Sequence, residues 1–220
     1  VDVLDTPILT VAPVTGLEDT AIALTIDAGL IDLSPTTSLS VDIGGLPADA
    51  TLSAGVDNGD GSWTLSAADL NGLTITPADD FSGSFDLTVT AQSADGNDVA
   101  TTTGSITVDV ADVADAPTLE VSDASGYEDS AIALDIDAGL TDSSEVLSVT
   151  ISGGPVYTSQ SADDENGDGR CTLSATDMNG LTITPADDFS GSFDLMVTAQ
   201  SADGKEVATP TGSITVDSAD

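Results

Sequence analysis

The sequence has 220 residues, with 39 acidic side chains against two basic ones, one cysteine and no histidine, and its formal net charge is −37 at pH 7. Such a surface repels the phosphates of nucleic acids and anionic lipid headgroups, so we expect no nucleic-acid partner. Without histidine or basic clusters there is no Ser-His-Asp or Cys-His machinery and no clamp for a phosphoryl group, so an enzyme is not expected. The apolar runs are far shorter than the roughly 20 residues of a membrane span, so we expect no membrane insertion.

Short runs in which apolar and polar residues alternate predict β-strands along the whole chain. In the first half these runs lie near residues 8–11, 22–26, 39–43, 63–65, 73–75, 85–89 and 106–110. Turn signals such as Asn71-Gly72 and Asp95-Gly96 separate them at intervals near ten residues. About seven antiparallel strands without helices are typical of an immunoglobulin-like Greek-key β-sandwich, so we predict an all-β fold.

The pattern occurs twice. Residues 71–109 match 179–217 with four differences in 39 positions, and residues 16–30 match 126–140 with three differences in 15. We therefore predict two tandem domains, 1–112 and 113–220, each close to the usual size of a single domain. Because Val1 lies inside a predicted strand, we expect a segment of a longer polypeptide, so the lack of a signal peptide does not locate the protein.

Aspartate outnumbers glutamate by 33 to 6. Aspartate is favoured in turns and in compact oxygen-ligand sites for hard cations, so the excess indicates turns and calcium. The run 57–61, Asp-Asn-Gly-Asp-Gly, has part of an EF-hand pattern but lacks its glutamate at the twelfth position, so we interpret it as a hairpin turn.

The single cysteine and the few aromatic residues are predicted to fill the core. Cys171 takes the position of Trp63 in the repeat, which favours a core or half-buried site. The aromatic residues have phases that suit core filling, and Tyr157, in a segment where the copies diverge, is the best candidate for an exposed exception.

The connection between the copies is short and acidic. The last strand of the first copy runs into Pro117 without a Gly/Ser spacer, and proline fixes its own φ and keeps its predecessor extended. Asp109, Asp112 and Asp115 follow one another at a spacing of three. Their charges repel, and a divalent cation would reverse the sign of that interaction.

Three motifs, taken together and in their order along the chain, resemble those of a known family. The linker 112–117, Asp-Val-Ala-Asp-Ala-Pro, is similar to the calcium linker of cadherins, and the motifs Gly-Leu-Glu-Asp-Thr at 16–20 and Gly-Tyr-Glu-Asp-Ser at 126–130 resemble the opening motif of such domains. The segments 76–85 and 184–193 resemble a stretch widespread in large bacterial adhesins secreted by type I systems, the repeats-in-toxin adhesins. The chain thus resembles their cadherin-like extender repeats.

The resemblance implies a Ca²⁺ site at the domain junction. Its implied ligands are Glu18, Asp79 and Asp80 from the first domain, Asp112 and Asp115 from the linker, and Asp142, Glu145 and Asp203 from the second domain. Equivalent partial sites are implied at the amino-terminal end with Asp2, Asp5, Asp32 and Asp95, and at the carboxy-terminal end with Glu128, Asp187, Asp188, Asp217 and Asp220.

The function that the resemblance implies is structural. Neighbouring repeats of one polypeptide, made rigid by Ca²⁺, would extend a giant adhesin from the bacterial surface into the extracellular space, as in biofilm attachment. Two alternatives remain: a carbohydrate- or cell-binding module that uses the divergent segments 34–56 and 143–164, and a self-associating filament or homophilic adhesion subunit.

Overall fold

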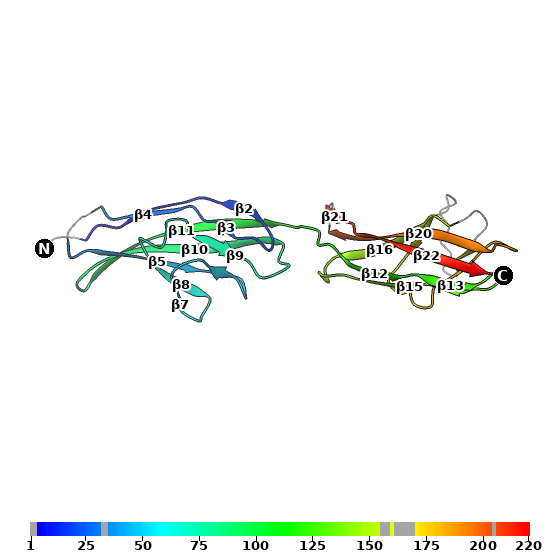
Figure 1. Ribbon diagram of the computed structural model, residues 1–220. Helices are drawn as coiled ribbons and strands as arrows, with labels where there is room; N and C mark the ends of the chain where they lie inside the picture. The colour runs from blue at the N-terminus through cyan, green and yellow to red at the C-terminus, as the bar shows by residue number, and fades with distance from the viewer. Residues whose placement is uncertain (1–3, 32–34, 155–158, 161–169, 204–205) are drawn as a thin grey trace. The chain divides into compact units, whose positions relative to one another are not determined.

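The structure is a computed structural model that describes residues 4–31, 35–154, 159–160, 170–203 and 206–220. The chain forms two compact units, Val1–Val113 and Ala114–Asp220, called unit 1 and unit 2 below. The described residues form strands and turns (Figure 1), and none of them belongs to a helix of the length and apolarity needed to cross a membrane.

Unit 1 begins with two short strands that belong to different sheets. Strand β1 (Ile8–Val11) pairs antiparallel with β4, whereas β2 (Val14–Leu17) pairs parallel with β11. Pro13 lies between them, and its lack of an N–H ends the first ladder at the point where the chain changes sheets. Unit 1 therefore has more strands than the seven predicted.

The remaining strands of unit 1 complete two layers. They are β3 (Ile22–Ala23), β4 (Ile26–Gly29), β5 (Ser38–Gly44), β6 (Thr51–Leu52), β7 (Val56–Asp57), β8 (Ser62–Ser66), β9 (Thr74–Thr76), β10 (Gly83–Asp95) and β11 (Asp98–Ala111). One layer has the order β2-β11-β10-β5-β8-β7, and the other contains the pair β1-β4 and the three-stranded sheet β3-β9-β6. Strands β10 and β11 form the long hairpin visible in Figure 1.

The core of unit 1 lies between these layers. Ile22 and Ile75 from one layer and Ile43, Leu87 and Ile106 from the other are at most 3% exposed and belong to one cluster. Because successive strand residues point to opposite faces, the alternating pattern buries one face and leaves Ser, Thr and Asp on the other. Unit 1 is therefore an immunoglobulin-like β-sandwich.

Unit 2 repeats this architecture. Its strands are β12 (Thr118–Ser122), β13 (Ala124–Tyr127), β14 (Ile132–Ala133), β15 (Asp135–Gly139), β16 (Val146–Ser152), β17 (Ser159–Gln160), β18 (Arg170–Leu173), β19 (Thr182–Thr184), β20 (Gly191–Asp203), β21 (Glu206–Ala208) and β22 (Thr211–Ala219). One layer has the order β13-β22-β20-β16-β18, with β21 beside β20, and the other contains β12-β15 and β14-β19-β17.

Two sequence differences between the copies have visible results. Pro210 replaces Thr102, and the single strand β11 of unit 1 becomes β21 and β22 in unit 2, because proline cannot donate to the ladder. Cys171, which replaces Trp63, is 4% exposed and pairs with Ile151 as Trp63 pairs with Ile43. The predicted core position of Cys171 is confirmed.

Candidate metal centre

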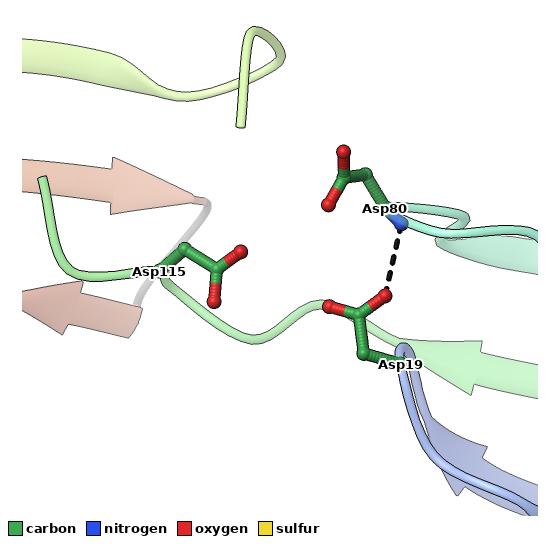
Figure 2. Close-up of side chains that lie close together, drawn as sticks. All are labelled: Asp19, Asp80 and Asp115. Atoms are coloured by element: carbon green, nitrogen blue, oxygen red, sulfur yellow. Dashed lines mark hydrogen bonds between the residues drawn. The ribbon is translucent and has the colours of Figure 1, made fainter. Parts of the chain in front are cut away.

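Two aspartates meet at the carboxy-terminal end of unit 1. Asp19 and Asp80 have φ values of 54° and 57°, a left-handed conformation that aspartate tolerates better than most residues. The carboxylate of Asp19 accepts a hydrogen bond of 3.0 Å from the backbone N–H of Asp80, drawn in Figure 2. One carboxylate oxygen of each residue lies within 4.8 Å of the other, so the pair offers adjacent oxygen ligands.

Glu18, next to this pair, holds the end of unit 1. It is 3% exposed, and its Oε1 accepts a hydrogen bond of 2.6 Å from the N–H of Val113. The parallel ladder places Leu17 beside Ala111, and the N–H of Glu18 continues it by donating to Ala111 O at 3.1 Å. Gly16 of β2 makes room for the side chain of Ile22, since a Cβ at Gly16 would lie 2.3 Å from Cγ1 of Ile22.

The other predicted ligands of unit 1 are exposed. Asp79 precedes Asp80 in the turn, and Asp112 follows strand β11. Asp19 was not among the predicted ligands, although Glu-Asp occurs in both copies of the motif. The structure brings Asp19 together with Asp80 and joins Glu18 to the residue after Asp112.

Two buried carboxylates mark the amino-terminal end of unit 2. Glu145 is 5% exposed, and its Oε1 accepts a hydrogen bond of 2.6 Å from the N–H of Asp115. Its Oε2 is buried, and no donor among the described residues reaches it. Asp142, three residues earlier, is 4% exposed.

Asp142 is held in its ionised form. The hydroxyl and the N–H of Ser144 both donate to it and lower the pKa of its carboxyl below the ordinary value of 3.8, although burial acts in the opposite direction. Asp115 and Asp203 are half-buried. The buried hydroxyl of Ser201 donates to the carbonyl oxygen of Asp115, which fixes the start of unit 2.

These residues fit a hard divalent cation. The donor set consists of carboxylate oxygens, which Ca²⁺ prefers, and the described candidates include no imidazole and no thiolate. A buried carboxylate oxygen without a donor is costly unless a cation compensates it, and Glu145 Oε2 is such an atom.

The carboxy-terminal end of unit 2 has the same turns as unit 1. Asp129 and Asp188 have φ values of 54° and 56°, and Asp129 accepts a hydrogen bond of 3.1 Å from the N–H of Asp188. Burial, and then the negative charges of Asp220, Asp129 and Asp188, raise the pKa of Glu128 above its ordinary value of 4.5. This acidic group resembles the predicted partial site at that end, and Asp129 is again the residue that the sequence prediction missed.

Two other sequence predictions can be compared with the structure. The run 57–61 forms a hairpin in which Asn58 N donates to Ser62 O at 3.0 Å, so the turn interpretation is confirmed. The prediction that Tyr127 fills the core is wrong, since it is 68% exposed and lines a pocket with Ser125, Ser192 and Asp217. Burial alternates along strand β13, and Tyr127 lies on its exposed face. Tyr157, the predicted exposed aromatic residue, lies outside the described residues.

No protein-family model matches the sequence, and no curated protein matches it either. Among solved structures, Drosophila N-cadherin EC1-4 is similar with a TM-score of 0.45 and 16% identity, over 99% of this chain and 50% of that chain. Human protocadherin-24 EC1-2 has a TM-score of 0.45 and 14% identity, over 98% and 99% of the two chains. The titin domains z1z2 in complex with telethonin have a TM-score of 0.35 and 12% identity, over 100% of both chains.

Two of these structures are cadherin fragments, and the third is a pair of titin domains. The chain spans about half the length of the Drosophila N-cadherin fragment.

Proposed function

We propose that this chain is a pair of structural extender repeats from a large Ca²⁺-dependent adhesin on a bacterial surface. In this proposal a cation held at the junction stiffens the chain, and many such repeats hold a distal binding domain away from the cell. The role requires no catalysis, and its direct partners are the neighbouring repeats of the same polypeptide.

The observation that carries the proposal is the state of Glu145. One of its carboxylate oxygens anchors the linker at Asp115, and the other is buried without a donor among the described residues. Removing an ionised carboxylate from water is unfavourable unless opposite charge or further hydrogen bonds replace the lost solvent. A cation beside Glu145 and Asp142 supplies that charge.

The linker is anchored on both sides of a single residue. Glu18 of unit 1 accepts the N–H of Val113, and Glu145 of unit 2 accepts the N–H of Asp115, so Ala114 alone lies between the two anchored positions. The Cα atoms of residues 113 and 115 can be at most about 7 Å apart because each peptide advances the chain by about 3.6 Å. Residues that can ligate a cation are therefore the same residues that fix the linker, so binding and stiffness are coupled.

Ca²⁺ would supply positive charge that several carboxylates can share. Without it, the acidic groups repel one another across the linker, and the repulsion weakens as salt increases. Because the unfolded chain presents no assembled site, binding also stabilises folding. At a Ca²⁺ concentration of 100 times Kd the gain is about 2.7 kcal/mol.

Calorimetric titration of the two-unit chain with Ca²⁺ tests the proposal. We expect a Kd of about 10⁻⁴ to 10⁻³ M, the range of extracellular calcium modules. The double variant Asp112→Ala, Asp115→Ala should lose at least one site. The control Asp27→Ala, Asp135→Ala removes the same charge from one exposed strand position in each unit, and it should bind as the wild type does.

Small-angle X-ray scattering tests the mechanical part. A chelator should broaden the distance distribution of the wild type, whereas the linker variant should scatter alike with and without Ca²⁺. Sedimentation at several concentrations separates this effect from self-association, which would change the particle mass. A wild-type scattering profile that does not respond to millimolar Ca²⁺ contradicts the extender proposal.

A second candidate function is carbohydrate binding, favoured by the exposure of Tyr127. An aromatic face beside hydroxyl and carboxylate groups suits a sugar ring, and the pocket of Tyr127 contains Ser125, Ser192 and Asp217. Unit 1 has Leu17 at the equivalent position. Glycan-array binding that Tyr127→Leu abolishes would support this function, and binding that survives the substitution would exclude this pocket.

A further inference from the structure

The amino-terminal ends of the two units differ at a position that is buried in unit 2 and half-buried in unit 1. Strand pairing fixes the equivalence: Ala94 pairs with Ser38 in unit 1, and its copy Ala202 pairs with Val146 in unit 2. The residue before each partner is Thr37 in unit 1 and Glu145 in unit 2. The sequence comparison alone does not align these residues securely, because they lie in the segment where the copies diverge.

A buried serine makes the same contact near this position in both units. The hydroxyl of Ser93 donates to Asp5 O at 2.8 Å, and its copy Ser201 donates to Asp115 O. Both serines are fully buried. The entry segments of both units are thus held by the same contact, and the residue beside it is threonine in unit 1 and glutamate in unit 2.

The buried polar atoms at this position are of different kinds. Thr37 Oγ1 and Glu145 Oε2 are both buried, and no hydrogen-bond partner within the described part of the chain reaches either atom. Thr37 offers a neutral hydroxyl, whereas Glu145 offers a carboxylate. In unit 1 the hydroxyl of Thr36 also donates to Asp95 at 3.2 Å. Unit 1 thus uses neutral hydroxyl groups where unit 2 has an additional negative charge.

We propose that the residue at this position determines whether the amino-terminal end of a unit holds a cation: the carboxylate of Glu145 completes a site for a hard divalent cation, and threonine does not. This inference rests on the proposed function and specifies its regulation. Affinity for Ca²⁺ depends on the number of charged oxygen ligands. Thr37 has no carboxylate, so unit 1 has one charged ligand fewer at this position. The amino-terminal end of unit 1, with Asp5 and Asp95 but no glutamate, consequently lacks the cation-binding strength of unit 2.

The test substitutes Glu145→Thr in the whole chain, which copies the residue that unit 1 carries in the same fold. We expect Ca²⁺ to bind about 10- to 100-fold more weakly by calorimetric titration, as is found when a ligand or its supporting residue is lost. The control Glu120→Thr removes an exposed glutamate from β12 of the same unit, and its affinity should equal that of the wild type.

The increase in melting temperature on adding Ca²⁺ gives a readout that a purely structural role would leave unchanged. Glu145→Thr removes a buried carboxylate oxygen without a donor and also the acceptor of the Asp115 N–H, and these two losses act in opposite directions on the metal-free melting temperature of unit 2. Its increase on adding Ca²⁺ should disappear. A lower metal-free melting temperature together with wild-type Ca²⁺ affinity would make Glu145 a structural residue and overturn the inference.

The remaining outcomes are distinguishable. If wild type and Glu145→Thr bind Ca²⁺ equally, the inference is wrong while the junction proposal stands. If the wild type does not bind millimolar Ca²⁺, both are wrong. If Glu145→Thr does not fold, Glu145→Gln decides, because its amide oxygen can still accept the N–H of Asp115: weaker Ca²⁺ binding supports the inference, and unchanged binding overturns it.

Discussion

The carboxy-terminal ends of the two units have the same acidic turns, yet their glutamates have different surroundings. Asp19 with Asp80 and Asp129 with Asp188 share the left-handed conformation and the same hydrogen bond. Glu18 is buried and accepts the N–H of Val113, which lies two residues after Ala111. The equivalent position in unit 2 would lie two residues after Ala219, past the last residue of this chain, and here burial and three neighbouring carboxylates raise the pKa of Glu128. The two glutamates therefore differ in whether the chain continues to a backbone N–H donor, and not in the turns beside them.

The Glu18→Ala substitution should cause the largest loss of stability. In Glu18→Ala the N–H of Val113 loses a charged acceptor, so unit 1 should lose about 1.5–3 kcal/mol of stability. Urea denaturation followed by Trp63 fluorescence measures this, because the only tryptophan of the chain lies in unit 1. Glu128→Ala, followed by the tyrosine signal of unit 2, is the matched variant and should cost much less. Equal losses would show that the Val113 contact does not distinguish the two ends.

Changing Asp19 should have a smaller effect. Asp19→Ala places alanine at a φ of 54° and removes the acceptor of the Asp80 N–H, which together should cost about 1–2 kcal/mol. Asp19→Asn keeps an acceptor and a side chain that tolerates this conformation, so it should cost about 0.5 kcal/mol or less. Thermal melting of both variants in chelator provides the measurement. If Asn and Ala are equally destabilising, the role of Asp19 is its charge and not the turn.

The smallest effect is expected from Glu128→Gln in unit 2. A raised pKa means that the folded state binds the proton more tightly than the unfolded state, so wild-type stability falls as pH rises from about 4.5 through the folded pKa. Glu128→Gln has no ionisable carboxyl at this position, so its stability should not show this decrease with pH. It should melt at a higher temperature than the wild type at pH 7 in chelator, and the gap should close below pH 4.5.

The exposed Glu120→Gln serves as its control and should follow the wild type at every pH. A melting difference for Glu128→Gln that is independent of pH would contradict the electrostatic explanation of this end.

Alternation of apolar and polar residues predicts the core well. Val41, Ile43, Leu87 and Val89 are fully buried, because a strand that has one buried face imposes a period of two. The number of strands was less predictable. The chain changes sheets at Pro13 because β1 and β2 pair with different strands. The alternation of apolar and polar residues does not indicate which strands pair with each other.

The candidate site was predictable only in part. The motif resemblance selected Glu18 and Glu145, and both are buried and anchor the linker. It did not select Asp19, because the contact of Asp19 with Asp80 joins two left-handed turns that are 61 residues apart. The equivalence of Thr37 and Glu145 required the strand register, since the surrounding segments differ in both sequence and length.

The parallel pairing of β2 with β11 determines how a unit responds to tension. Four residue pairs, from Val14 with Val108 to Leu17 with Ala111, join the second strand of unit 1 to its last strand, and β13 with β22 repeats this in unit 2. A pull on the two ends of a unit acts along these strands in opposite directions, so it loads all their hydrogen bonds together in shear. Such a force cannot break these hydrogen bonds one at a time. We therefore expect each unit to resist stretching until these hydrogen bonds break together and the core is exposed.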